Sequence, residues 1–204
     1  QSKIIEIGSN DGTFLDNFKD TDLDYIGFEP SSNVAELANN NGIKTINSFF
    51  NLNSLDLIKD FVGQTDVIFA ANVICHIPDL IDLIKTIDKL LSKDGVFVFE
   101  EPYLGSMFKK ISYDQIYDAH VFIFSIHSVK SIFNSHGFDL INVTIQYRPP
   151  IATPTVVEGD LFFGQGGDQL NGGRRGIGDF QPVLITVSFC TIVVHRRFGT
   201  DQCD

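Results

Sequence analysis

Short apolar runs recur through the first hundred residues, separated by segments of mixed polarity. They are four to six residues long and nearly all apolar, and they comprise Lys3–Gly8, Tyr25–Glu29, Ile43–Ile46, Asp66–Ala71 and Val96–Glu100. A strand that is apolar on both faces is typical of a parallel sheet covered on both sides. The pattern therefore predicts five buried strands in one sheet.

The segments between these runs favour helices. The predicted helices span Thr13–Phe18, Ser31 or Ser32 to Ala38, Leu55–Val62 and Pro78–Leu91. The last is the clearest, because its Leu and Ile side chains fall on one stripe and Pro78 suits a first helical turn. Strands that alternate with helices indicate an α/β fold, a doubly wound and mostly parallel sheet.

The chain continues with less regular patterning. A polar connector, Lys109–His120, precedes a predicted helix over Ser128–His136 and a predicted strand over Phe138–Tyr147. Arg148-Pro149-Pro150 ends that strand. Val183–Val194 is a further strand candidate, which we expect to pair antiparallel with 138–147 and to close the sheet.

Composition changes near residue 148. All ten Lys lie at or before Lys130, and all five Arg lie at or after Arg148. We therefore expect a core over 1–147 and an atypical Gly- and Arg-containing tail over 148–204. The tail is interpreted either as contributing one closing strand, 183–194, or as an artefact of the reading frame. Its Gly pairs at 166–167 and 172–173 favour a flexible linker over an anion-binding loop.

Charge and cysteine content exclude several function classes. The net charge of −11 argues against nucleic acid as a partner, because a phosphate binder needs clustered Lys and Arg. No apolar run reaches 18 residues, so we expect no membrane span, and without a leader pattern we expect a cytoplasmic protein. Cys75, Cys190 and Cys203 fit neither a disulfide framework nor a CxxC metal site, so no metal is expected.

The turn after the first predicted strand carries the strongest motif, Glu6-Ile7-Gly8-Ser9-Asn10-Asp11-Gly12. Glycine lets the backbone turn tightly and approach a ligand closely. A nicotinamide fingerprint, G-x-G-x-x-G, fails because Asn10 stands at its second glycine. Glu29 follows 21 residues after Gly8, at the end of the next strand, where a carboxylate can accept both hydroxyls of a ribose.

At these residues the chain resembles the class I S-adenosylmethionine-dependent methyltransferases, over roughly residues 3–147. The resemblance implies a Rossmann-like methyltransferase fold, truncated at its N-terminus, with S-adenosyl-L-methionine as cofactor. It implies that Glu6, Gly8, Ser9, Asn10, Asp11 and Gly12 form the methionine loop and that Glu29-Pro30 holds the ribose. Phe49 and Phe50 would flank the adenine, although both also fit as core aromatics, and Asn72 would lie beside the methionine end.

Five stretches are similar to a narrower group, the C-methyltransferases of nucleotide-linked keto-deoxysugars. They are EIGSNDGTFL (6–15), GFEPSSNVAELANNNGI (27–43), ANVICHIPDL (71–80), GVFVFEEPYL (95–104) and YDQIYDAHVFIFS (113–125). The resemblance implies a nucleotide-sugar substrate and makes His120 the base that removes a proton next to the ketone. An imidazole is suited to that step because its pKa lies near neutrality. Tyr117 would line the sugar site and His76 the pocket wall.

One residue departs from that group. Its His-Glu pair before the final His is Asp118-Ala119 here, so a Glu that would orient the base is missing. Two alternatives therefore stay open: a methyl acceptor with oxygen or nitrogen as the nucleophile, and a fragment that binds the cofactor without turnover. The chain begins two residues before the first predicted strand, and we interpret it as a fragment whose oligomeric state is open.

Overall fold

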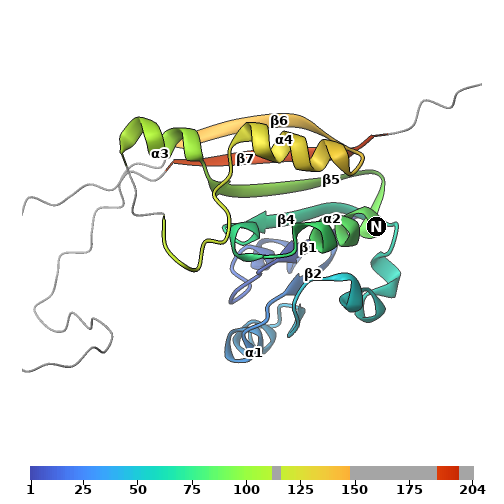
Figure 1. The fold of residues 1–204 in the computed structure, drawn as a ribbon. Coiled ribbons are helices and arrows are strands. Elements are labelled where there is room, and N and C mark those ends of the chain that lie inside the picture. Colours follow the sequence, from blue (N-terminus) through green and yellow to red (C-terminus); the bar gives the residue numbers. More distant parts are fainter. Residues whose placement is uncertain (112–115, 148–187, 198–204) are drawn as a thin grey trace, which may run out of the picture.

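The computed structural model describes residues 1–111, 116–147 and 188–197. Seven strands of these residues form one sheet, in the order β3-β2-β1-β4-β5-β7-β6. Their bounds are β1 Lys3–Ile7, β2 Asp24–Phe28, β3 Thr45–Ile46, β4 Thr65–Ala71, β5 Leu91–Pro102, β6 Phe138–Tyr147 and β7 Ser188–Arg196. β1 to β5 run parallel, and β7 lies antiparallel between β5 and β6 (Figure 1).

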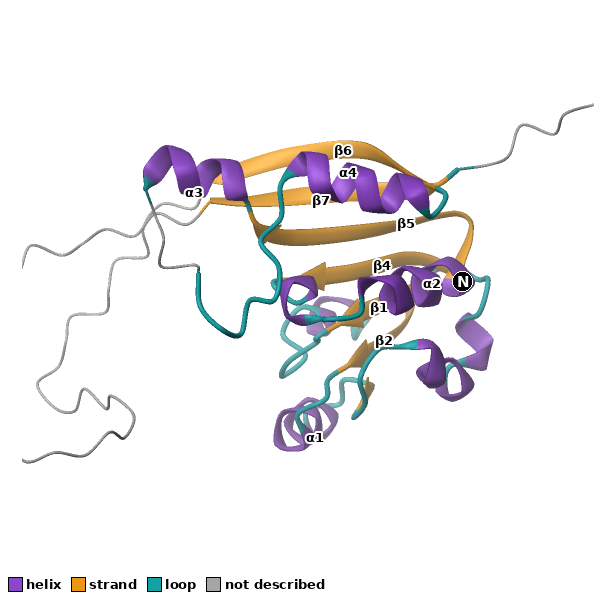
Figure 2. Cartoon of the chain, viewed as in Figure 1, coloured by secondary structure: helices purple, strands orange, loops and turns teal. Residues whose placement is uncertain are grey.

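Helices complete the doubly wound arrangement (Figure 2). The α-helices are α1 Ser32–Asn40, α2 Leu80–Leu90, α3 Leu104–Lys110 and α4 Ile126–Ser135, and the 3-10 helices are η1 Leu15–Phe18, η2 Leu52–Leu57, η3 Lys59–Phe61 and η4 Ile74–His76. Asp79 caps α2 by accepting the N–H of Asp82 at 2.9 Å, and Ser125 caps α4 in the same way through Ser128. Such caps satisfy backbone donors that a helix start leaves unpaired.

Two apolar cores cover the two faces of the sheet. The larger core packs α2 and α4 against the face that presents Ile5 and Ile7 of β1. The smaller core packs Leu15 and α1 against the face that presents Ile4. Side chains alternate along a strand, so Glu6 belongs to the same face as Ile4. The sheet thereby becomes the middle layer of three.

The strand predictions for the parallel part are confirmed, and several helix predictions are wrong in type or extent. The predicted helix over 55–62 is two 3-10 helices, η2 and η3, and the helix over 13–18 shortens to η1. An isolated helix this short gains too few hydrogen bonds to offset its nucleation. Part of the predicted polar connector is helical, as α3, and Leu91, the last residue of the helix predicted over 78–91, already belongs to β5.

β7 overlaps the C-terminal strand prediction of 183–194 and extends two residues beyond it, to Arg196. Residues 183–187 of that prediction fall outside the described range. β7 pairs antiparallel with β6, as predicted, and also with β5. Ile192 and Val194 are fully buried there. The division into a 1–147 core and a 148–204 tail, with its reading-frame alternative, stays a prediction.

Among the described residues no helix has both the length and the apolar character that a membrane crossing requires.

Candidate active site

The carboxyl ends of β1, β2, β4 and β5 meet at one edge of the sheet, where ligands of open α/β folds bind. The polar residues that end these strands are the ones singled out in the sequence. The topology therefore brings the turn after β1, Glu29, and the segment from Asn72 to His76 to one edge.

The turn after β1 is a tight backbone loop. The N–H groups of Gly8 and Ser9 both donate to the carbonyl of Phe28, at 2.8 and 3.0 Å. Gly8 and Gly12 have φ of +68° and +85°, which favours glycine, and Asn10 has φ of +52°. Asparagine tolerates this left-handed conformation better than most residues, which explains how Asn10 replaces a fingerprint glycine.

Glu29 is buried at the end of β2, and its carboxylate closes the loop. One oxygen accepts the N–H of Asn10 at 3.1 Å, and the other accepts the N–H of Ser31 at 2.8 Å. Asn47 fixes the same corner by donating its side-chain amide to the carbonyls of Glu29 and Pro30, at 3.0 and 2.9 Å. A carboxylate has about four lone-pair positions, so two remain for ligand hydroxyls.

Glu6 and Ser9 lie under the loop with polar atoms that have no protein partner. Glu6 Oε2 and Ser9 Oγ are both buried and unpaired. Burial raises the pKa of Glu6 to about 8, and the nearby negative charge of Asp11 adds to the shift. Asp11 itself is partly exposed; the Thr13 side chain and backbone N–H donate to it and hold its pKa below the usual range.

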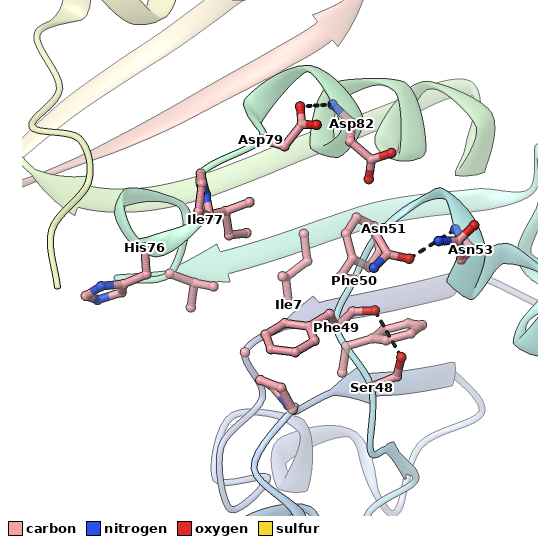
Figure 3. Close-up of a pocket in the computed structure, with 15 residues that line it drawn as sticks. Ile7, Ser48, Phe49, Phe50, Asn51, Asn53, His76, Ile77, Asp79 and Asp82 are labelled. Atoms are coloured by element: carbon pink, nitrogen blue, oxygen red, sulfur yellow. Dashed lines mark hydrogen bonds between the residues drawn. The ribbon is translucent and has the colours of Figure 1, made fainter.

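A cavity of about 440 Å³ opens beside the turn (Figure 3). Its volume lies in the range of small-molecule sites. Of the residues proposed from the sequence, Gly8, Pro30, Phe49, Phe50 and His76 line it. Phe49 is 70% exposed and leaves a face open for a ring, whereas Phe50 is a core residue that packs edge-on against Phe28. Phe49 therefore fits the proposed contact with adenine, whereas Phe50 fits ordinary core packing.

A histidine cluster, His76, Tyr117 and His120, borders the cavity. The rings of His76 and His120 have centroids 4.8 Å apart, and the Tyr117 hydroxyl lies 2.8 Å from His120 Nε2. His76 Nδ1 bonds the Ala119 carbonyl at 2.7 Å. The structure therefore brings together the three residues proposed for catalysis, although they are 44 positions apart at the extremes.

The other proposed residues lie nearby without lining the cavity. Asn72 follows β4 with φ of +56° and donates its N–H to the Glu100 carbonyl at 2.8 Å. Asn10 and Glu29, bonded to each other, are chain neighbours of the lining residues Gly8 and Pro30. Glu6 points to the opposite face of the sheet from Ile7, which does line the cavity.

Sequence reasoning missed Glu101 at the end of β5. This fully buried carboxylate accepts the N–H groups of Val73, Ile74 and Cys75 at 3.0, 2.8 and 3.4 Å, and so fixes the turn that carries His76. Burial raises the pKa of Glu101, and burial with its nearby charge raises that of the Cys75 thiol. The signal in the sequence that could have revealed Glu101 is the pair of consecutive glutamates, Glu100-Glu101, after an apolar run.

The cavity wall beyond Phe50 was also missed. It includes Asn51 and Asn53 from the start of η2 and Asp79 and Asp82 from the start of α2. Asp82 joins the two elements by accepting the N–H of Leu52 at 3.2 Å. Their polarity resembles ordinary helix capping in the sequence, so only the packing of η2 against α2 reveals that they share a wall.

A comparison with protein families gives one match, a methyltransferase domain, over residues 1–143. The chain belongs to this family. Its sequence is 31% identical over 140 residues to the C-methyltransferase NovU of Streptomyces niveus, covering 69% of this chain. The chain spans about a third of the length of that curated relative, 33%.

Solved structures agree on the fold. A methyltransferase in complex with the Trm112 activator of Haloferax volcanii superposes with a TM-score of 0.68 at 12% identity, over 97% of this chain and 83% of that one. An S-adenosylmethionine-dependent methyltransferase of Archaeoglobus fulgidus gives 0.61 at 13%, over 95% and 85%. These superpositions confirm the class I methyltransferase fold. The family match over residues 1–143 supports S-adenosylmethionine, the methyl donor of this class, as the cofactor.

The site fits that cofactor. The cavity reaches the glycine turn, the Glu29 carboxylate keeps acceptor capacity, and buried Ser9 Oγ is unpaired beside the loop. Gly8 also requires its lack of a side chain, because a Cβ there would lie 2.4 Å from Val73 Cγ2. Close packing of Val73 on the Gly8 backbone therefore leaves no room for a side chain at this position of the cavity wall.

Proposed function

We propose that this chain transfers a methyl group from S-adenosylmethionine to the carbon next to the ketone of a nucleotide-linked deoxysugar, with His120 as the base. The observation that carries the proposal is the contact between His76 and His120. His76 lines the cavity, and the ring centroid of His120 lies 4.8 Å from that of His76, which brings the second imidazole close to a substrate beside His76.

The cofactor residues of this proposal are those of the glycine turn and its surroundings. The Gly8–Gly12 backbone holds the methionine part, with Asn72 beside it, and Glu29 accepts from the ribose hydroxyls. Phe49 lies against the adenine. When bound, S-adenosylmethionine supplies a sulfonium methyl group to an attacking carbon.

Proton removal falls to His120. A carbon beside a ketone becomes a nucleophile only after it loses a proton, and a positioned imidazole contributes typically 10²–10⁴-fold to such a step. In this proposal the imidazole of His120 takes the proton, and the Tyr117 hydroxyl lies 2.8 Å from His120 Nε2. Tyr117 thereby fixes the ring, and His76, held by the Ala119 carbonyl, forms the wall against which the sugar lies.

The test compares His120→Ala with His127→Ala, an exposed histidine in the first turn of α4. We expect methyl transfer to nucleotide-linked keto-deoxysugars to fall about 10²–10⁴-fold for His120→Ala. Cofactor affinity by calorimetry and the His127→Ala activity should stay unchanged. Proton exchange at the α-carbon in heavy water should be lost together with transfer.

Equal activity of the two variants would contradict the assignment of the base, and a product methylated on oxygen or nitrogen would contradict the carbon acceptor. A second candidate, cofactor binding without turnover, is favoured by Ala119, which offers the site a backbone carbonyl and no carboxylate. Cofactor binding with no methyl transfer to any acceptor in either variant or the parent chain would support it.

A further inference from the structure

Cys75 lies next to the histidine cluster. One donor atom from each of Cys75, His76 and His120 lies within 4.8 Å of the other two. Cys75 and His76 come from η4, whereas His120 comes from the loop before α4. Three such donors from two segments, converging at the edge of a cavity, form a candidate ligand set.

The donors match the chemistry of borderline-soft divalent metals. Thiolate and imidazole are the ligands that tetrahedral Zn²⁺ prefers, and three protein ligands leave a fourth position open. Donor atoms around one such ion lie roughly 3.3–3.8 Å apart, given metal–ligand bonds of about 2.0–2.3 Å. The set must therefore close by about 1 Å from 4.8 Å, and the exposed His76 ring is the donor able to move, since Cys75 is fixed in the core.

The surroundings already orient these side chains. His76 Nδ1 bonds the Ala119 carbonyl, an outer contact typical of metal-binding histidines, which leaves Nε2 as the ligand atom. The backbone of Cys75 is held from both sides: its N–H donates to Glu101 at 3.4 Å, and its carbonyl accepts from Phe122 at 3.2 Å. The second bond ties η4 to the loop that carries His120.

The Glu101 carboxyl also affects the charge balance of this ligand set. It lies buried against the backbone of Cys75, and one of its oxygens, Oε2, has no partner. A thiolate added beside it is costly in a low-dielectric core unless a cation compensates. A divalent ion at the mouth of the cavity supplies that compensation.

We propose that Cys75, His76 and His120 bind Zn²⁺ or a chemically similar divalent ion, and that the bound ion withholds His120 from proton transfer. The inhibition of proton transfer rests on the function proposed above, whereas the metal binding does not. The ion takes up the imidazole lone pair that removal of the substrate proton needs. Sequence spacing hides the site, because His120 lies 45 residues after Cys75.

The test uses Co²⁺ as a spectroscopic probe of the chelator-treated chain, in a Cys203→Ser background so that the thiols of Cys75 and Cys190 remain. We expect a thiolate-to-cobalt charge-transfer band and the intense visible bands of a tetrahedral ion. Cys75→Ser should abolish the charge-transfer band. Cys190→Ser is the matched control, since Cys190 is an equally buried free cysteine on the neighbouring β7 and should leave the band unchanged.

His76→Asn provides a second variant on the exposed side of the site, where folding is not at risk. It should weaken Co²⁺ binding by more than about 100-fold, because even partners outside the first coordination sphere are worth about 10–100-fold. No charge-transfer band in the Cys203→Ser parent, or an unchanged band in Cys75→Ser, would overturn the site.

The proposed inhibition of methyl transfer by the bound ion is measured separately. Zn²⁺ should inhibit methyl transfer reversibly, and Cys75→Ser should need more than about 10-fold higher Zn²⁺ for the same inhibition. Cobalt binding as expected, with Zn²⁺ leaving transfer unchanged, would overturn the proposed inhibition alone. Failure of the proposed function itself shows as absent methyl transfer while the cobalt spectra still decide the metal site.

Discussion

The turn over residues 6–12 and the histidine cluster meet the same cavity but are built differently. The turn is a continuous stretch of backbone, held by hydrogen bonds to Phe28 and Glu29. The histidine cluster joins two segments far apart in sequence through side chains, of which His76 and Tyr117 are exposed. The first can be read from a local motif, whereas the second exists only when the fold brings its members together.

This difference separates binding from turnover. Changes in the turn should alter both cofactor affinity and stability, because both depend on the backbone geometry of the turn. Changes in the histidine cluster should act on the rate with little effect on affinity. The four predictions below test that separation, from the largest expected effect to the smallest.

Glu6→Gln tests the buried carboxyl under the turn. With a folded pKa of about 8 against 4.5, Glu6 keeps its proton in the folded chain and loses it on unfolding between these pH values. The parent chain should therefore lose roughly 1.4 kcal/mol of stability per pH unit from about pH 4.5 to 8. The loss stops above the folded pKa. Urea unfolding at several pH values should show Glu6→Gln without this slope, while exposed Glu36→Gln retains it.

Gly8→Ala and Gly63→Ala form a matched pair. Both glycines have φ of +68°, but a Cβ at Gly8 meets Val73 at 2.4 Å and one at Gly63 meets nothing within 4 Å. Each variant should lose about 1–2 kcal/mol of stability from the left-handed backbone, and Gly8→Ala should lose about 1–3 kcal/mol more from the clash with Val73. Only Gly8→Ala should also lose S-adenosylmethionine affinity by calorimetry. Equal affinities would show that close approach at Gly8 does not matter for binding.

Glu29→Gln removes charge but keeps shape. Both carboxylate oxygens accept backbone N–H groups, from Asn10 and Ser31, and an amide can accept at only one of them. We expect cofactor affinity to fall roughly 10- to 100-fold, the value of one or two charged hydrogen bonds. Glu36→Gln on α1 serves as control in the same titration. A larger effect on the rate than on affinity would contradict a binding role.

Tyr117→Phe removes the hydroxyl 2.8 Å from His120 Nε2. Losing one neutral hydrogen bond to the ring should slow methyl transfer by about 10-fold, equivalent to about 1.4 kcal/mol. The cofactor Kd should not change. A matching loss of cofactor affinity would mean that the histidine cluster and the turn are not separate after all.

Local pattern was sufficient for the parallel strands and for α2. Each strand is a short apolar run ended by a polar or glycine residue, and α2 combines an apolar stripe with a capping residue, Asp79. The prediction for 55–62 failed because the segment over 52–61 forms two 3-10 helices, of which η2 packs against α2, and local periodicity does not report such packing. α3 was missed because the sequence 104–110 offers no N-cap, and its structure likewise has no capping hydrogen bond.

The residues of the candidate site likewise fall into those that the local sequence predicts and those that only tertiary packing reveals. The Gly8–Gly12 turn and Glu29 were predicted because strand, turn and carboxylate lie within one βαβ unit, where spacing in sequence translates directly into position. Glu101 was missed, and its three hydrogen bonds to η4 depend on β4 and β5 lying side by side. Asp79 and Asp82 were missed for the corresponding reason, the packing of η2 on α2.

The sequence by itself determined the parallel α/β architecture, the glycine turn with its family resemblance, and the residues proposed for catalysis. Apolar periodicity and backbone-restricted glycines act over a few residues, so they can be read locally. Only the tertiary structure decided that β7 enters the sheet between β5 and β6, that of the two cavity-lining aromatics Phe49 is exposed and Phe50 buried, and that Cys75 lies beside His76 and His120. These arrangements depend on burying apolar surface between distant segments, and such packing is a property of the whole fold.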